Sequence, residues 1–464
     1  MSGRQSLMEN VREWTMGIRR RQSWPRPWVY AALCLVAVIL AAVVLIPLSV
    51  VALNGYVKGR VERAFDQANP GATLRIRGLV YAIGPNRLAA RSITLRTAGA
   101  TMTVGRVSLA GVRWMQLLRG RAGGAAARAR TSLDVADLTV EFPGAHYGIR
   151  CARVRVSQPD SELVAQGIEL APLAGDEEAI SAGPYRTTWF RVSVPELRVR
   201  GLACGELLNG TAYRARSVHV LRPAFDAFAY HEKPPGPFVS SPLMVNEALA
   251  AIRRPLRVDS LSITDGYAAY RDRVVAGAAP GVLTFTEVNA FAVGITNRGA
   301  PPDSILLRAQ GKLMDAGLLK LAMVIPPISP EFSLRYSGSL GPMDLTRLGG
   351  FLDIVEYYRI KSGRAQWASY EIDVKAGRAR GQVRASFDEL KIAVLDRQTG
   401  TEKGWDNRIA SFLANRFTIR PDNTPAEPGP MRVGTVRYRR KPGDTFLQVV
   451  WFALRSGVLD VIHR

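Results

Sequence analysis

An uncharged apolar run between Trp28 and Leu53 constrains this chain more than any other feature. The run contains no Asp, Glu, Lys or Arg. A helix of this length reaches about 39 Å, enough to cross a hydrocarbon core of about 30 Å with some tilt. We therefore predict a membrane-spanning helix, in preference to a buried core helix or a cleaved signal peptide, whose apolar region is usually shorter. The residues that mark this membrane anchor are Trp28, Leu33, Val38, Leu45 and Leu53.

The flanks of the run predict its orientation. Residues 1–27 contain six arginines against two glutamates, whereas basic and acidic residues nearly balance just after the run. Positive charge gathers on the cytoplasmic side of membrane helices. We therefore predict a cytoplasmic arm over residues 1–27, a transmembrane helix over 28–53 and an exported body.

The whole chain is strongly basic, with 62 Lys and Arg against 39 Asp and Glu and a formal net charge of +23. Two interpretations stay open: an arginine-rich solvated surface, or a surface for anionic lipid or the outer membrane. An exported body without a long basic run or an aromatic ladder argues against nucleic acid. We expect the bilayer, and envelope proteins, as partners.

Beyond the anchor, the chain repeats a short apolar pattern. An apolar residue is followed after two residues by a second, and after one more residue by a third. The last two share one face of a strand, and a bulge or tight bend would return the first to that face. The triplets are Ala90/Ile93/Leu95, Val104/Val107/Leu109, Val135/Leu138/Val140, Cys151/Val154/Val156, Val194/Leu197/Val199, Ala215/Val218/Val220, Val258/Leu261/Ile263 and Phe387/Leu390/Ile392.

Triplets set side by side would build one apolar surface with polar residues on the other face. We predict that this surface is a lipid-binding groove. Its candidate residues are Val135, Leu138, Val140, Val194, Leu197, Val199, Val258, Leu261, Ile263, Phe387, Leu390 and Ile392.

Interruptions of the strand pattern divide the body. We predict a β-rich part over 54–230, a linker with a short helix over 231–255, and a second β-rich part over 256–464. Further helices are expected over 343–354, over 405–416 and at the C-terminal end, where an amphipathic helix either closes the end of the body or contacts a bilayer surface.

No residue pattern indicates catalysis or a cofactor. The four histidines show no metal-ligand spacing, and nucleotide, hydrolase and metalloprotease motifs are absent from the sequence. We therefore predict a protein that is not an enzyme and binds no metal. Cys151 and Cys204 either form a disulfide in an exported compartment or stay buried and free.

Several segments together resemble a known family. The anchor is followed by the helical stretch NGYVKGRVERAFDQANPG and by the strands RIRGL, LAARSITLR and MTVGRVSLAGV. Later segments are VDSLSITDGYAAYRD, GVLTFTEVNAFAVGITN, SGSLGPMDLTRLGGFLD and SGRAQWASYEIDVKAGRARGQVRASFDELKIAVLD. Over about 72–113 and 256–464 the chain is similar to AsmA-like bacterial envelope proteins, especially short members with a domain of unknown function in the C-terminal region.

The resemblance implies a mainly β fold: one transmembrane helix, then an elongated, twisted antiparallel β-groove shaped like a taco, with a few short helices. It also implies a bacterial inner-membrane protein whose periplasmic body binds or transfers phospholipid and maintains the lipid balance of the outer membrane. About 400 exported residues are too few for one copy to span the periplasm. The alternative is a non-enzymatic scaffold that docks envelope assembly machinery, whose groove its own side chains would fill.

Overall fold

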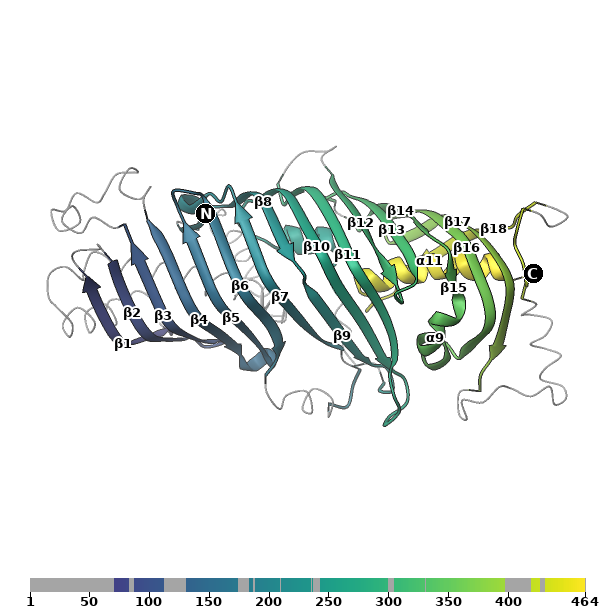
Figure 1. The fold of residues 1–464 in the computed structure, drawn as a ribbon, viewed down its shortest axis with the longest axis horizontal. Helices are drawn as coiled ribbons and strands as arrows, with labels where there is room; N and C mark the ends of the chain where they lie inside the picture. The colour runs from purple at the N-terminus through teal and green to yellow at the C-terminus, as the bar shows by residue number, and fades with distance from the viewer. Residues whose placement is uncertain are drawn as a thin grey trace, which may run out of the picture.

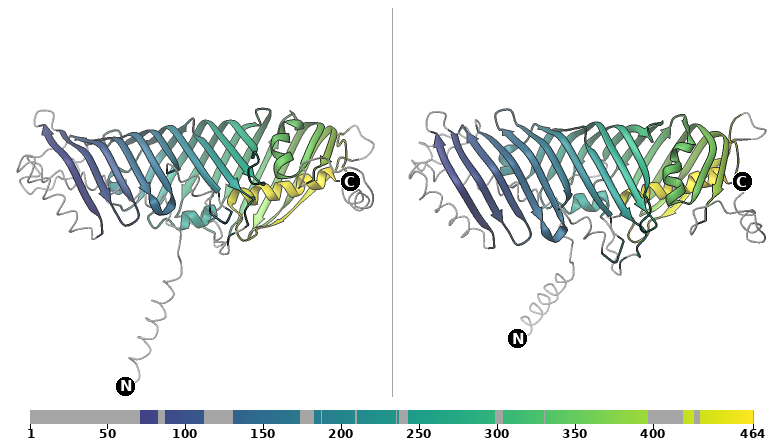
Figure 2. Two further views of the ribbon diagram at one scale, coloured as in Figure 1. Left: turned by 90° about the horizontal axis from the view of Figure 1, so that it is seen from below. Right: turned by 60° about the horizontal axis from the view of Figure 1, so that its bottom comes forward.

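A computed structural model describes residues 71–82, 87–111, 131–173, 183–186, 188–208, 210–234, 236, 243–298, 304–329, 331–396, 419–425 and 430–463. The described residues form one elongated, twisted 18-stranded sheet with a few short helices (Figures 1 and 2). The predicted mainly β fold class is therefore confirmed. The predicted membrane helix and the expected helix over 405–416 lie outside the described residues, among which no helix is long and apolar enough to span a membrane.

The strands of the sheet follow one another along the chain. Those before the midpoint are β1 (Thr73–Ala82), β2 (Arg87–Arg96), β3 (Thr101–Ala110), β4 (Ser132–Phe142), β5 (Tyr147–Ser157), β6 (Glu162–Pro172), β7 (Thr188–Arg200), β8 (Tyr213–Leu221) and β9 (Ala224–Tyr230). Those after it are β10 (Leu256–Arg273), β11 (Gly281–Thr296), β12 (Ile305–Leu313), β13 (Gly317–Ile325), β14 (Leu334–Leu340), β15 (Met343–Asp344), β16 (Tyr358–Lys375), β17 (Arg378–Val394) and β18 (Val433–Arg439).

Neighbouring strands pair antiparallel except at the middle of the sheet. Strands β8 and β9 share one position beside β7 and run parallel to β10. The sheet is therefore mixed, and the prediction of an antiparallel sheet is wrong at this join. The reason is the connection over 231–255, which is long enough to return the chain to the edge where β8 began.

Short helices accompany the second half of the sheet. They are α8 (Val245–Ala250), the 3-10 helix η3 (Leu345–Leu348), α9 (Gly349–Val355) and α11 (Phe446–Ile462); the first half carries the 3-10 helix η2 (Pro143–Ala145) and α7 (Cys204–Leu208). Helix α9 contacts β10, β11 and β16, and α11 contacts β16, β17 and β18. The short helix expected within 231–255, the helix expected over 343–354 and the expected C-terminal helix correspond to α8, to η3 with α9, and to α11.

Helix α11 begins at a capping box. The Thr445 hydroxyl accepts a hydrogen bond from the Gln448 backbone N–H at 3.3 Å, and the Gln448 side chain accepts one from the Thr445 N–H at 2.9 Å. Two N–H groups that the first helical turn leaves without backbone partners are satisfied in this way. The buried residues Val449, Ala453, Gly457 and Val461 recur every four positions, so they form one stripe along the helix.

A line of backbone irregularities crosses the sheet from β2 to β10, and we call it the first crease. The strand pairing places one residue from each successive strand side by side along this line. These residues are Ser92, Gly105, Asp137, Ala152, Gly167, Pro195, Arg222 and Asp265. Along this crease, positive φ angles occur in every second strand, for example 50° at Ser92 of β2, 56° at Asp137 of β4 and 62° at Gly167 of β6. Proline is tolerated inside a sheet where no ladder hydrogen bond is needed, and Pro195 occupies such a level.

In each triplet, two residues separate the first apolar residue from the second, and we call these two residues the two-residue step. At the crease, both of them point away from the buried face of the sheet. In β4 the buried positions are Leu133, Val135, Leu138, Val140 and Phe142, so the alternation changes phase at Ala136 and Asp137. Apolar side chains before and after the step consequently share one face. The predicted bend is confirmed here.

A second crease crosses β8, β10 and β11. Its level contains Gly201, just after β7, with Arg216, Asp259 and Gly294. The φ angles of Gly201 and Gly294 are 65° and 75°. In β16 and β17 a similar irregularity joins Gly363 and Glu389, whose φ angles are 146° and 52°. Each of the eight triplets has one of these creases at its two-residue step.

The apolar face that the creases preserve, here called the inner face, supports two separate cores. The N-terminal core contains buried side chains of β1–β6, from Leu74 to Ala165. The C-terminal core contains buried side chains of α8, β12–β14, β16–β18 and α11, from Met244 to Val461. The strands between the cores connect two differently built ends of one sheet.

Candidate functional site

The central inner face, which we define as Val194, Val218, Val220, Val258, Leu261 and Ile263, is the candidate site. These side chains belong to β7, β8 and β10, and all are partly buried. None of them is a member of either core. Four of them, Val194, Val258, Leu261 and Ile263, were predicted as groove residues.

Cross-strand pairing brings the central residues together. Leu261 faces Val218 and Ala292 in the register, and Ile263 faces Val220 and Ala290. Directly paired residues of one face have Cβ atoms about 5 Å apart. The central inner face is therefore a continuous apolar surface, although its members lie up to about 70 residues apart in the chain.

The predicted groove residues nearer the N-terminus have a different environment. Val135, Leu138 and Val140 are 1%, 7% and 4% exposed and belong to the N-terminal core. Leu197 and Val199 are partly buried and pack against that core. These five side chains lie on the predicted face, but the structure uses at least the first three as core residues.

The predicted residues nearer the C-terminus are also core residues. Phe387 and Leu390 are buried in the C-terminal core, and Ile392 packs against it. Helix α11 lies on the same end of the sheet, where Val449 and Ala453 are fully buried. At this end of the sheet, the amphipathic C-terminal helix therefore packs against the protein's own strands.

Helix α11 has a second apolar stripe, which differs from the buried one and was not predicted as separate from it. Leu447, Trp451 and Val458 are 66%, 39% and 40% exposed, and Leu454 between them is partly buried. Their spacing of four, three and four residues places them along one side of the helix. The 100° periodicity could have revealed two stripes, because apolar residues occupy more than one face of this helix.

The two cysteines outside the predicted anchor are free and buried. Cys151 lies on β5, where its Sγ is 3.4 Å from the backbone oxygen of Gln166, and Cys204 begins α7. The structure thus has the second of the two alternatives, buried free thiols. Burial raises the pKa of both thiols, which keeps them protonated and poorly nucleophilic.

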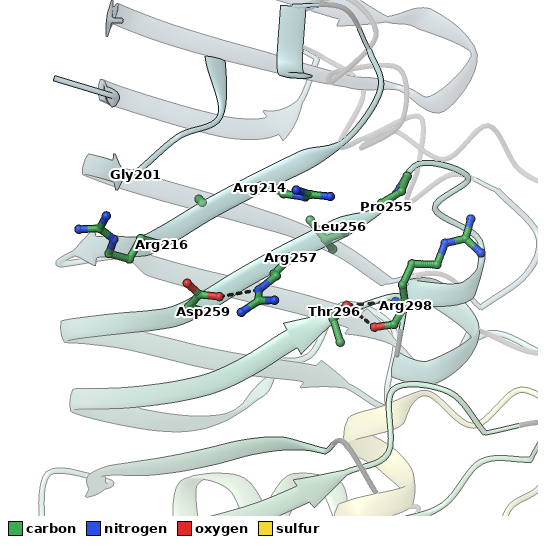
Figure 3. Close-up of a pocket in the computed structure, with 10 residues that line it drawn as sticks. Gly201, Arg214, Arg216, Pro255, Leu256, Arg257, Asp259, Thr296 and Arg298 are labelled. Carbon is green, nitrogen blue, oxygen red and sulfur yellow. Dashed lines mark hydrogen bonds and ion pairs between the residues drawn. The ribbon is translucent and has the colours of Figure 1, made fainter. Parts of the chain in front are cut away.

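The outer face, opposite the inner face, contains a cavity of about 570 Å³ at the second crease (Figure 3). Four arginines line it: Arg214 and Arg216 of β8, Arg257 of β10, and Arg298 just after β11. Sequence reasoning missed this group because its members come together only through the parallel β8–β10 join.

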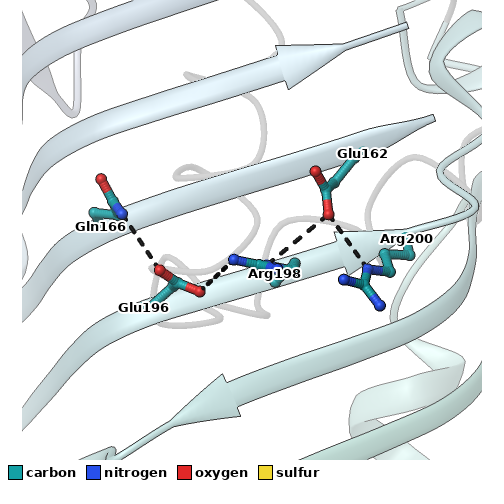
Figure 4. A network of polar contacts seen from close by, with 5 residues as sticks. All are labelled: Glu162, Gln166, Glu196, Arg198 and Arg200. Atoms are coloured by element: carbon teal, nitrogen blue, oxygen red, sulfur yellow. Dashed lines mark hydrogen bonds and ion pairs between the residues drawn. The ribbon is translucent and has the colours of Figure 1, made fainter. Parts of the chain in front are cut away.

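A polar network covers the neighbouring outer face of β6 and β7 (Figure 4). Arg198 donates to Glu196 at 2.9 Å, Arg200 donates to Glu162 at 3.3 Å, and Gln166 donates to Glu196 at 3.3 Å. Exposed pairs of this kind contribute little to stability, typically about 0–1 kcal/mol. Both arginines of this network thus have carboxylate partners.

Within the described ranges, no three His, Cys, Asp or Glu side chains are grouped so that they could hold a metal ion. The closest polar constellation is His231 with Asp272, whose Nδ1 and Oδ1 atoms are 2.6 Å apart, and Tyr270, whose hydroxyl donates to Asp272 at 3.3 Å. It joins the ends of β9 and β10 and gives the buried Asp272 carboxylate its partners. No protein-family model matches the chain, and no curated protein is significantly similar to it.

Proposed function

We propose that this chain is an inner-membrane-anchored periplasmic protein that binds phospholipid acyl chains on its central inner face and thereby transfers or balances outer-membrane lipid. The observation that carries the proposal is that the central inner face is apolar, continuous and outside both cores. The uncharged run at 28–53 and the resemblance to AsmA-like proteins support the location and the ligand class.

The energetics favour an apolar ligand at this place. Each methylene that leaves water contributes about 0.8 kcal/mol, so about ten buried methylenes of an acyl chain contribute about 8 kcal/mol, against an association cost of at least about 4 kcal/mol. Their neighbours along β10, such as Ser262 and Asp259, point to the outer face. An acyl chain would therefore contact one side of β10 only.

The two cores restrict where the lipid binds. Helix α11 covers β16–β18, and the buried side chains of the N-terminal core already contact one another. We place the acyl chain across β7, β8 and β10, with the exposed stripe of α11 as its continuation toward the C-terminal end.

The experiment measures phospholipid that co-purifies with the full chain extracted in mild detergent. The test variant Leu261→Asp/Ile263→Asp places two carboxylates on the inner face, and the matched control Ser262→Asp/Thr264→Asp places them on the outer face of the same strand. We expect the test variant to lose most of the bound phospholipid and the control to keep it. Equal lipid content in both variants would contradict the proposal.

A second candidate is a non-enzymatic scaffold for envelope assembly machinery. The specific observation in its favour is the packing of α11 against β16–β18, because an inner face filled by the protein's own helix leaves no room for lipid there. If both Asp variants retain the same lipid content as the unaltered chain, the scaffold becomes the better account.

A further inference from the structure

The outer-face cavity at the second crease contains more positive charge than its own carboxylates neutralise. Arg257 donates to Asp259 at 2.8 Å, and Arg214 lies 3.3 Å from Glu206 of α7. The Arg298 guanidinium donates to a backbone carbonyl, that of Arg253, at 3.2 Å. No side chain in the described ranges forms an ion pair with Arg216.

The register of the sheet concentrates these charges. Arg214 and Arg257 are direct partners in the parallel β8–β10 pairing, and Thr296 is the next residue in the same row. Like charges placed directly opposite each other destabilise a sheet. A bound anion between the two strands would remove this repulsion.

At the second crease one glycine, Gly201, is among the residues that line the cavity. Gly201 and Gly294 stand at the level of Arg216 and Asp259, and both have left-handed φ angles that favour glycine. A Cβ atom on Gly201 would lie 2.6 Å from the Cβ of Arg216. A larger residue at Gly201 would therefore displace Arg216, one of the four arginines that line the cavity.

We infer that this cavity binds a phosphate group, held by Arg214, Arg216, Arg257 and Arg298. Guanidinium groups match phosphate oxygens in planar, two-point hydrogen bonds, which are stronger than bonds between neutral groups. The Thr296 side chain is not free for this role, because it accepts from the Arg298 N–H and donates to the Arg298 carbonyl. The shared chemistry admits two sources, a free phosphate compound or a phospholipid headgroup.

The inference does not rest on the acyl-chain proposal, because the arginines and the central inner face lie on opposite sides of β8 and β10. Alternation along β8 places Arg214 and Arg216 outward and Ala215 inward. A phosphate site could exist without an acyl-chain site, and the reverse.

The test uses the full chain held in an amphipol and two probes, inorganic phosphate and dihexanoyl phosphatidylglycerol, with dissociation constants measured by calorimetry. The test variant Arg216→Gln/Arg298→Gln removes the two cavity guanidiniums for which the described part of the chain provides no carboxylate partner. The matched control is Arg91→Gln/Arg106→Gln, which removes another pair of exposed arginines, directly opposed on β2 and β3 and distant from this cavity. Both variants carry the same net charge, and thermal unfolding verifies that both fold.

We expect the test variant to bind at least ten-fold more weakly and the control to change less than two-fold. If only the test variant loses affinity for inorganic phosphate, the site binds free phosphate compounds. If the unaltered chain binds only the lipid, and the test variant loses affinity for it, the site binds phospholipid headgroups. No saturable binding of either probe, an unchanged test variant, or equal weakening in both variants would overturn the inference. Lipid content of the Leu261→Asp/Ile263→Asp variant is measured separately, so failure of one proposal does not imply failure of the other.

Discussion

The central strands and the C-terminal strands of this sheet carry the same apolar triplet but bury it to different extents. Val258, Leu261 and Ile263 are all partly buried, whereas Phe387 and Leu390 are 4% exposed. The two triplets share a bend at the two-residue step and an outward polar pair. The difference lies in what covers them, because α11 lies over β16–β18 and is joined to them through the C-terminal core.

A triplet therefore determines on which face of the sheet its side chains lie. It does not determine what packs against that face. Coverage of β17 and β18 depends on residues far along the chain, such as Gly434 and Gly457. At that contact a Cβ on Gly457 would lie 2.5 Å from Val383 Cγ2. Only a helix and strands that both carry small residues can approach so closely.

The largest effect should separate the two regions directly. Val383 is 1% exposed beneath α11, so Val383→Asp leaves an unpaired charge in the C-terminal core and should lower the free energy of unfolding by roughly 4 kcal/mol. The matched change Leu261→Asp on the partly buried central face should cost about 1 kcal/mol. Urea unfolding of both variants measures the difference, and equal losses would mean that both faces are closed.

A somewhat smaller effect should follow from separating α11 from the sheet. A Cβ on Gly434 would clash with the Gly457 carbonyl, so Gly434→Val should lower the free energy of unfolding by about 3 kcal/mol. Gly99→Val is the control, because a Cβ added to Gly99 would have no heavy atom within 4 Å other than those of its chain neighbours. Thermal unfolding and proteolysis of α11 are the measurements. An intact, protease-resistant α11 in Gly434→Val would show that this contact does not hold the helix.

The creases should respond alike in both regions. Asp265 in the centre and Glu389 near the C-terminus have φ angles of 55° and 52°, a conformation that a β-branched residue adopts at a cost of about 1–2 kcal/mol. Asp265→Val and Glu389→Val should therefore lower stability equally, and the corresponding glycine variants should not. Urea unfolding measures the free energy of unfolding of each variant. If only one of the two valine variants is destabilised, the backbone irregularities at Asp265 and Glu389 are built differently.

The smallest effect concerns pH. Burial raises the pKa of Tyr370 in the C-terminal core to about 12. The unfolded chain ionises this tyrosine near pH 10, so above that pH the unfolded state binds fewer protons and the folded state loses stability, by about 1 kcal/mol at pH 11. Melting temperatures between pH 9 and 12 should fall less steeply for Tyr370→Phe. An identical slope would place the pH dependence elsewhere, for example at Tyr336, whose pKa burial also raises.

The sequence predicted the parts of this structure that depend on local pattern. The triplets indicated strands, a common apolar face and a bend, and the structure contains all three. The parallel β8–β10 join was not predicted, because the pattern of residues 231–255 shows a linker but not the direction of the strand that follows. The four-arginine cavity was missed for the same reason, since Arg214 and Arg257 are 43 residues apart and meet only through that join.

The closed C-terminal end was anticipated only as an alternative. The sequence predicted an amphipathic C-terminal helix and left open whether it closes the end of the body or contacts a bilayer surface. The buried stripe of Val449, Ala453, Gly457 and Val461 identifies the sheet as its partner. Small residues at two of these four positions were the available signal, because close approach requires them.

The most direct test of the account places a photoreactive benzoylphenylalanine in the full chain within its native membrane at Ile263, Ser262 or Phe387. These positions represent the central inner face, the outer face of the same strand and the C-terminal core. Crosslinked phospholipid is then measured by mass spectrometry. The account predicts lipid adducts at Ile263 and background levels at Ser262 and Phe387. Background levels at Ile263, or equal adducts at all three positions, would contradict it.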